Sequence, residues 1–252
     1  MATGTQPQLE ARSVDLADES ADAIPPLENG DKLTRFEFER RYTAMPELKK
    51  AELLEGMVYL MSSPVSQKRH GRPHLMVCGW IDRYLEQTPG VDAGDNTTLR
   101  LDLDNEPQPD CMLYITPECG GTVKISEGDI LEGAPELIFE VASSRASYDL
   151  HTKLHVYRRS GVNEYVVWRT RERIIDWFVL RDGNYVQQTM TPAGFHQSTI
   201  FPGLWLDVAA MLGFDRKALS ACLAQGTSSP EHAAFVARLA ARAGTHSSSL
   251  AS

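Results

Sequence analysis

Residues 136–143 read Glu-Leu-Ile-Phe-Glu-Val-Ala-Ser, a short apolar run with an acid at its centre. Such a run is typical of a strand that is covered on both faces of a sheet. A carboxylate in that setting is costly unless it is paired or bound to a metal ion. Glu140 is therefore the first candidate site residue. The alternatives are a solvent-facing edge position or a structural ion pair.

Two more acids stand where strands are expected to begin. Asp110 opens the apolar stretch 110–115, behind two prolines. Taken alone it is typical of a turn aspartate, but beside Glu140 on a neighbouring strand it would form the oxygen-ligand pair that Mg²⁺ prefers. Glu52 opens an early strand segment, and the spacing does not decide between Glu52 and Glu55 as a site residue.

The segment after the Glu140 strand, residues 147–160, has the pattern of a helix that ends at Gly161. At 100° per residue, Lys153 borders the apolar stripe of this helix. Its ammonium group could then reach the end of the Glu140 strand. The alternative is that it extends into water, as lysines at the edge of an apolar face often do.

Two histidine pairs have the i, i+4 spacing that can bind a metal. His70 and His74 lie on the apolar stripe of a helix expected over residues 66–87, either as core histidines or as site residues. His151 and His155 fall away from the apolar stripe of their helix and are expected in solvent. No H-E-x-x-H, G-x-S-x-G, Walker A or G-x-G-x-x-G pattern occurs, so the enzyme classes of those motifs have no support.

The remaining patterns indicate a mixed sheet flanked by helices, an α+β or α/β fold. We expect helices over 34–43, 66–87 and 147–160, and strands over 52–62, 97–103, 110–115, 136–143, 164–169, 173–180 and 185–189. We expect three regions: a disordered acidic leader over 1–31, the folded domain over 32–222, and an Ala/Ser-rich tail over 223–252 that is partly helical or disordered.

Composition restricts the function classes. The net charge is −9 over 252 residues, and residues 1–33 alone hold seven acids and two bases, or −5. Without a basic tail, nucleic-acid binding would need a local patch, such as Lys68, Arg69 and Arg72, together with bound cations. No apolar run approaches the roughly 20 residues of a membrane span, and the acidic start does not have the pattern of a secretory signal.

The cysteines are Cys78, Cys111, Cys119 and Cys222, and they form no C-x-x-C pair. Their scattered spacing favours neither a zinc site nor a disulfide framework. Free thiols without an export signal favour a reducing, cytoplasmic location.

With Glu140 and Lys153 placed, the chain resembles the Uma-two family of restriction-endonuclease-like proteins, which has the PD-(D/E)XK nuclease fold. The resemblance follows the family in order and spacing over about residues 32–212. The matching stretches are Glu52-Leu-Leu-Glu-Gly56, Met61-Ser-Ser-Pro64 followed by His70, Gln108-Pro-Asp110, Gly133-Ala-Pro-Glu-Leu-Ile-Phe-Glu-Val141, Asp149-Leu-His-Thr-Lys153, and Tyr157 leading to Gly161-Val-Asn-Glu-Tyr165. Each stretch is short, but the ordered set is specific.

The resemblance implies that Asp110 supplies the aspartate of the nuclease motif and that Glu140 supplies its second acid. The lysine of the motif usually stands two residues after that acid, where this chain has Ala142. In this family the lysine lies in the next helix, which matches Lys153. Glu52 matches an acid that the family contributes ahead of the core strands.

His70 matches a histidine that recurs in the family. The chain departs from the family at two places. Tyr165 is followed by Val-Val-Trp-Arg where the family often has a tryptophan and an acid, and Ser143-Ser144 stands where it often has Ser-Pro. Neither change removes a proposed ligand, so both concern the shape of the pocket.

The resemblance implies an endonuclease that depends on Mg²⁺ or Mn²⁺ and hydrolyses phosphodiester bonds of nucleic acid, above all DNA. Asp110 and Glu140 would hold the ion, Lys153 would orient the attacking water, and Glu52 would complete the site. No membrane partner is expected, and a homodimer is the assembly that suits cleavage of a two-fold duplex.

Two alternatives remain open at this point. The first is a catalytically silent nuclease fold that serves as a binding or oligomerisation module, which the net charge of −9 favours. The second is a transition-metal hydrolase built on His70 and His74 with Glu52, which would retain zinc.

Overall fold

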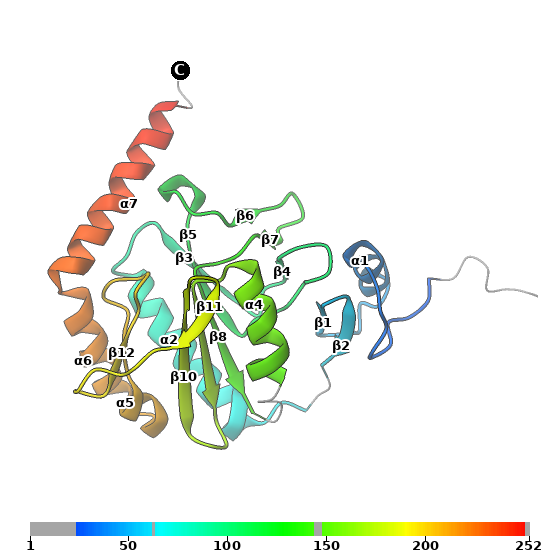
Figure 1. The fold of residues 1–252 in the computed structure, drawn as a ribbon, viewed down its shortest axis with the longest axis horizontal. Coiled ribbons are helices and arrows are strands. Elements are labelled where there is room, and N and C mark those ends of the chain that lie inside the picture. Colours follow the sequence, from blue (N-terminus) through cyan, green and yellow to red (C-terminus); the bar gives the residue numbers. More distant parts are fainter. Residues whose placement is uncertain (1–23, 62–63, 144–147, 250–252) are drawn as a thin grey trace, which may run out of the picture.

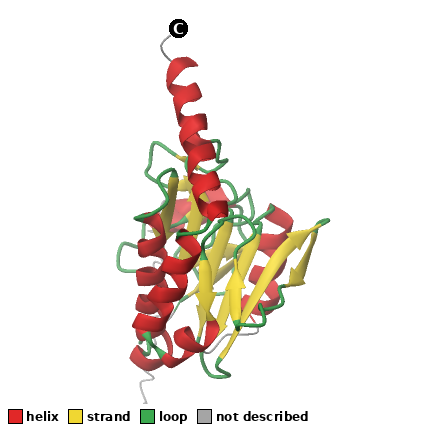
Figure 2. Cartoon of the chain, turned by 90° about the vertical axis from the view of Figure 1, so that its left-hand side faces the viewer, coloured by secondary structure: helices red, strands yellow, loops and turns green. Residues whose placement is uncertain are grey.

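A six-stranded mixed sheet forms the centre of the molecule, with helices on both of its faces (Figure 1, Figure 2). The computed structural model describes residues 24–61, 64–143 and 148–249. The strands run in the order β11 (Asn184–Gln187), β10 (Ile174–Arg181), β9 (Glu164–Arg169), β8 (Leu137–Ala142), β5 (Cys111–Ile115) and β3 (Val91–Asp95). Within this sheet β8 and β9 pair in parallel and the other neighbours are antiparallel. The predicted α+β fold with a mixed sheet is confirmed.

Helices form a layer on each face of the sheet. They are α2 (Arg72–Leu85), α4 (Leu154–Ser160), α5 (Val208–Gly213), α6 (Arg216–Thr227) and α7 (Pro230–Ser249), whereas α1 (Arg35–Thr43) packs against strand β1 outside this sheet. α2, α5, α6 and α7 share one hydrophobic cluster with one face of the sheet, whereas α4 packs on the other face. Because α4 connects the parallel strands β8 and β9, it lies over that strand pair.

β8 is buried along its whole length because each of its faces meets a layer of helices. Phe139 and Val141 belong to the hydrophobic cluster on the α2 side. Ile138 and Ala142 belong to the cluster on the α4 side. Since side chains alternate along a strand, Glu140 also points to the α4 side.

The strand segment predicted over 52–62 is a hairpin of β1 (Ala51–Leu54) and β2 (Met57–Leu60), and residue 62 itself lies outside the described residues. Its two-residue turn consists of Glu55 and Gly56, with φ values of 53° and 73°. Both residues adopt the left-handed conformation that a type I′ turn requires, and glycine adopts it without a steric penalty.

The two faces of β1 have different surroundings. Ala51 and Leu53 pack in a small hydrophobic cluster with Phe38 of α1. Leu54 joins the larger cluster on the α4 side of the sheet. Glu52, two residues before Leu54, therefore faces the main sheet rather than α1.

Both long helices predicted near the site begin with π-helical turns. The helix expected over 66–87 starts as the π-helical segment Gln67–Gly71 and continues as α2. The helix expected over 147–160 starts as the π-helical segment Asp149–Lys153 and continues as α4; residue 147 itself lies outside the described residues. Such irregular turns are frequent at functional sites.

One predicted strand is shorter than expected and several strands were not expected. The strand predicted over 97–103 is reduced to β4 (Leu99–Arg100), because the N–H groups of Leu101 and Asp102 donate to Asn105 O in a turn. The strands without a prediction are β3, β6 (Lys124–Ile125), β7 (Leu131–Glu132), β12 (Phe195–Gln197) and β13 (Trp205–Asp207).

The predicted leader and tail lie at the two ends of the chain. Residues 1–23 and 250–252 lie outside the described residues, whereas residues 24–31 pack against the hairpin, where Leu27 is buried and Gly30 N donates to Val58 O. The predicted division at residue 222 falls inside α6, and α6 and α7 cover most of the predicted tail.

Over the described ranges, no helix has the length and apolar character needed to cross a membrane.

Candidate active site

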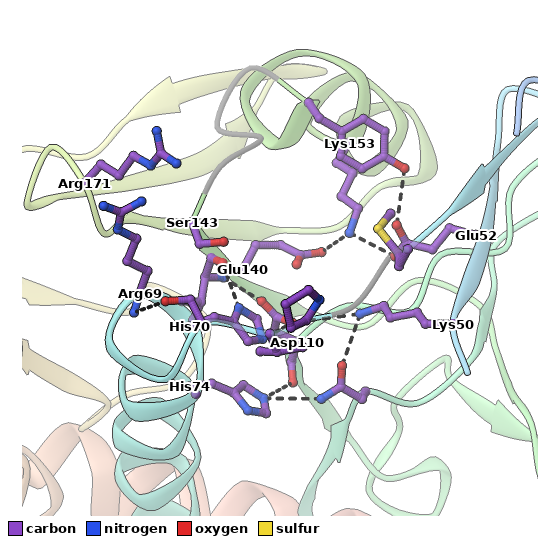
Figure 3. Close-up of a pocket in the computed structure, with 18 residues that line it drawn as sticks. Lys50, Glu52, Arg69, His70, His74, Asp110, Glu140, Ser143, Lys153 and Arg171 are labelled. Carbon is purple, nitrogen blue, oxygen red and sulfur yellow. Dashed lines mark hydrogen bonds and ion pairs between the residues drawn. The ribbon is translucent and has the colours of Figure 1, made fainter. Parts of the chain in front are cut away.

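A cavity of about 660 Å³ opens where the ends of β5 and β8 meet β1, the start of α2 and the segment before α4 (Figure 3). The residues proposed from the sequence all line it: Glu52, His70, Asp110, Glu140 and Lys153. The other lining residues that Figure 3 labels are Lys50, Arg69, His74, Ser143 and Arg171. The fold thus gathers side chains from five distant segments on the wall of one cavity.

Asp110 and Glu140 stand opposite each other on neighbouring strands. β5 and β8 pair with Cys111 opposite Phe139, and the next step of this antiparallel register brings Asp110 opposite Glu140. Opposed residues share a face of the sheet, with Cβ atoms about 5 Å apart. Asp110 Oδ2 accepts the Val141 N–H at 2.8 Å, which fixes the carboxylate against the end of β8. Asp110 is 4% exposed and Glu140 is 3% exposed.

Lys153 bridges two of the acids. Its Nζ donates to Glu140 Oε1 at 2.7 Å and to Glu52 Oε1 at 2.9 Å (Figure 3). The lysine is therefore buried rather than extended into water, and Glu140 is a buried, paired acid rather than an edge residue. The structure also distinguishes the two acids of the hairpin, because Glu52 is buried in the site and Glu55 is exposed in the turn.

Neutral donors complete the hydrogen bonding of these acids. Tyr157 of α4 donates to Glu140 Oε1 at 3.1 Å, and Tyr148 donates to Glu52 Oε2 at 3.2 Å. Burial raises the pKa of both phenols well above the ordinary value, so both remain protonated donors at neutral pH. The backbone N–H of Gln108 donates to Glu52 Oε1 at 2.8 Å, which ties the hairpin to the segment that leads into β5.

The other oxygen of Asp110 faces basic side chains. Oδ1 lies 3.6 Å from His70 Nε2 and 3.9 Å from Lys50 Nζ, both beyond hydrogen-bond distance. His70 Nδ1 lies 3.2 Å from Val141 O, which orients the ring. Sequence reasoning missed Lys50. It stands two residues before Glu52, so the period of a strand would have indicated that the two side chains share a face.

The alternative hydrolase centre of His70, His74 and Glu52 is not assembled. Both oxygens of Glu52 accept hydrogen bonds from other groups, Lys153 among them. His74 Nε2 turns away from Glu52 to Asp95, whose Oδ1 lies 2.9 Å away. The three side chains therefore line one cavity without forming one ligand set.

His74, which also lines the cavity, belongs to a second cluster of side chains with Cys78, Asp95 and Cys111. A hydrogen bond with Cys78, followed by one with the backbone of Asp110, raises the pKa of His74 to about 9. A hydrogen bond with Cys111, followed by one with His74, lowers the pKa of Cys78 to about 6. In the metal-free protein we therefore expect an imidazolium and a thiolate next to each other at neutral pH.

Exposed basic side chains extend from the mouth of the cavity. A second hollow of about 460 Å³ is lined by Lys68, Arg69, Arg171 and Arg173 among others. Arg69 and Arg171 line both hollows, so the two are continuous. These four residues form a basic track that leads away from the acid pair. The sequence suggested Lys68, Arg69 and Arg72 for such a patch. Arg72 lines neither hollow and instead places its guanidinium carbon 4.0 Å from the centroid of the Phe214 ring, whereas the two arginines after β9 join the track only in the fold.

Comparison with known proteins gives a family and a fold. The sequence matches the model of the family Uma2, described as "Putative restriction endonuclease", over residues 36–209. Among solved structures, the chain is similar to "a putative nuclease belonging to DUF820" from Anabaena variabilis, with a TM-score of 0.50 and 12% sequence identity. That similarity covers 73% of this chain and 97% of the other, and at this identity it concerns the fold. No match was found among curated proteins.

Proposed function

The chain belongs to the Uma2 family of restriction-endonuclease-like proteins, and we propose that it is a divalent-metal-dependent endonuclease that hydrolyses nucleic acid, with DNA as the expected substrate. The observation that carries this proposal is the pair of buried carboxylates, Asp110 and Glu140, on opposed strands at one wall of a cavity. Burying two carboxylates and a lysine costs desolvation free energy, which favours a functional role for this cluster.

The donor set fits Mg²⁺ or Mn²⁺. Carboxylate oxygens are the ligands that both ions prefer, and Asp110 and Glu140 would supply them. Among the nearest charges, Glu52, Asp110 and Glu140 contribute −3 while Lys50 and Lys153 contribute +2. The sum, −1, leaves a negative site that favours a divalent cation.

The chain's own residues supply the rest of the chemistry. A bound ion would polarise a phosphodiester oxygen and lower the pKa of a water molecule at the site. Lys153 is a fixed cationic donor beside Glu140, where it can orient the attacking water and stabilise negative charge that develops on the phosphate. Glu52 restrains the same ammonium group from the opposite side, so its role is to position Lys153.

The basic track supports a polyanionic substrate. Lys68, Arg69, Arg171 and Arg173 are exposed along two continuous hollows, as expected for side chains that contact successive backbone phosphates. The net charge of −9 does not oppose this, because at physiological salt exposed charges act over only about 8–10 Å.

The test is a cleavage assay on supercoiled plasmid, single-stranded DNA and single-stranded RNA, each with Mg²⁺, Mn²⁺ or chelator. We expect cleavage only with a metal ion. Asp110→Asn and Glu140→Gln should each lose about 100-fold or more in rate, because several kcal/mol of transition-state stabilisation depend on the ion. Glu55→Gln changes an exposed acid of the hairpin turn and is the matched control, which should keep its rate.

Cleavage that persists in chelator, or in both site variants, would contradict the proposal. Tight nucleic-acid binding without cleavage under any of these conditions would instead favour the binding-module alternative. Preference for RNA over both DNA substrates would correct the substrate while leaving the metal-dependent chemistry in place.

A further inference from the structure

The second cluster of side chains has the composition of a transition-metal site. His74 and Cys78 of α2, Asp95 of β3 and Cys111 of β5 bring their ligand atoms within 4.8 Å of one another. We propose that this cluster binds Zn²⁺ through two cysteines, one histidine and one aspartate. The proposal does not depend on nuclease activity, because none of these four side chains belongs to the acid pair.

Local structure explains why the four residues meet. His74 and Cys78 are four residues apart on α2, so they lie on the same helical face. Asp95 and Cys111 are paired directly in the antiparallel ladder of β3 and β5, so their side chains share a face of the sheet. α2 packs against that face. The spacing of the cysteines along the chain gave no sign of this cluster, because Cys78 and Cys111 lie on a helix and a strand that meet only in the fold.

The separations resemble those of a tetrahedral site. Cys78 Sγ lies 3.3 Å from Cys111 Sγ and 3.6 Å from His74 Nε2, and His74 Nε2 lies 2.9 Å from Asp95 Oδ1. Zinc bonds of about 2.0–2.3 Å separate neighbouring ligand atoms by roughly 3.3–3.8 Å. Since every pair is already within 4.8 Å, shifts of about 1 Å would complete the geometry.

The surroundings allow an ion to enter and favour a soft one. Cys111 is buried, His74 and Cys78 are half-buried, and the Asp95 side chain is exposed. A depression of about 380 Å³, lined by Cys78, Asp95 and Cys111 among others, connects the cluster with solvent. Thiolate and imidazole ligands select Zn²⁺ over Mg²⁺, so the two sites should take different ions.

A zinc ion bound to this cluster would hold the start of β5 in place. Cys111 follows Asp110 directly, and His74 Nε2 lies 3.0 Å from Asp110 O. The ion would replace the proton on His74 Nε2, so Asp110 O would lose its hydrogen bond from His74. It would keep the hydrogen bond from the backbone N–H of Asn96, with an N–O distance of 3.3 Å. With four protein ligands the site leaves no open position for chemistry, so its role is to fix β5 against α2.

The first test is the zinc content of the full chain, purified in reductant without chelator and measured by elemental mass spectrometry. We expect zinc in equimolar amount in the wild type and its loss in Cys78→Ser and Cys111→Ser. Cys119→Ser and Cys222→Ser are matched controls, because both cysteines are buried outside the cluster, and these variants should keep their zinc.

A second readout guards against variants that fail to fold. Metal-free wild type titrated with Co²⁺ should show sulfur-to-cobalt charge transfer and the intense visible bands of tetrahedral cobalt. Asp95→Asn alters an exposed side chain and should lower the cobalt affinity by about tenfold or more. The proposal would be overturned by a reduced wild type that holds no zinc and gives no such spectrum. A Cys78–Cys111 disulfide in place of metal uptake would overturn it as well.

Discussion

Replacing Lys153 with methionine would keep the length of the side chain but leave two buried carboxylates without their shared cation. In the wild type, Lys153 Nζ lies 2.7 Å from Glu140 Oε1 and 2.9 Å from Glu52 Oε1, and the three side chains are at most 4% exposed. At an effective dielectric constant of about 20, each pair attracts by about 6 kcal/mol before desolvation is subtracted. Removing one partner of a buried ion pair typically costs about 3–5 kcal/mol, and we expect Lys153→Met to lose stability in that range.

The loss should depend on pH with a defined sign. Without the ammonium group, Glu52 and Glu140 can avoid burying two uncompensated charges only by taking up protons. Low pH favours that uptake in the folded variant. The difference in unfolding free energy between variant and wild type should therefore be largest near pH 8 and shrink towards pH 5.

Urea denaturation followed by tryptophan fluorescence measures this difference. Lys50→Met is the matched control, because Lys50 Nζ lies 3.9 Å from Asp110 Oδ1 and its side chain is 24% exposed, so its loss should stay below about 1 kcal/mol. Adding Glu52→Gln to Lys153→Met should recover part of the lost stability, since one of the two unpaired charges is then removed. A Lys153→Met protein within about 1 kcal/mol of wild type, or with a deficit that does not change with pH, would refute the reasoning.

Arg171→Ala should weaken nucleic-acid binding and reduce the slope of log K against log salt by about 1, whereas Arg238→Ala on α7 should change neither; fluorescence anisotropy at several salt concentrations separates the two outcomes. A second prediction concerns Glu106, where burial, followed by contact with Glu39, raises the pKa from 4.5 to about 8. The folded state then binds more protons than the unfolded state. The free energy of unfolding therefore decreases, through this carboxyl group, as the pH rises from 4.5 towards 8. Glu106→Gln should gain stability relative to wild type between pH 5 and pH 9, by up to a few kcal/mol at about 1.4 kcal/mol per pKa unit. Urea denaturation measures the change in unfolding free energy caused by Glu106→Gln. The same change at pH 5 and at pH 9 would contradict this assignment.

The central strands were predictable because their patterns are strong. β8 is apolar apart from Glu140, and the hairpin carries a two-residue turn with glycine. β3 could not be predicted in the same way, because its sequence, Val-Asp-Ala-Gly-Asp, has glycine and two acids and therefore low strand propensity. It forms a strand because β5 offers it an unpaired edge, which is a tertiary effect.

The residue types of the candidate site could be singled out from the sequence, whereas their contacts could not. A buried acid and a lysine at the border of an apolar stripe are local signals, and Glu140 and Lys153 carry them. The bond between Lys153 and Glu52 joins residues 101 positions apart and depends on how the hairpin packs against the sheet. The contact between Cys78 and Cys111, 33 positions apart, depends likewise on the packing of α2.

Calorimetric titration of Mg²⁺ into the metal-free protein tests most directly whether Asp110 and Glu140 hold a divalent ion. Mg²⁺ avoids thiolate ligands, so the cysteine cluster should not contribute to the heat. We predict binding by the wild type, a loss of about tenfold or more in affinity in Glu140→Gln, and unchanged affinity in Cys78→Ser. The absence of binding by the wild type, or equal affinity in Glu140→Gln, would contradict the account.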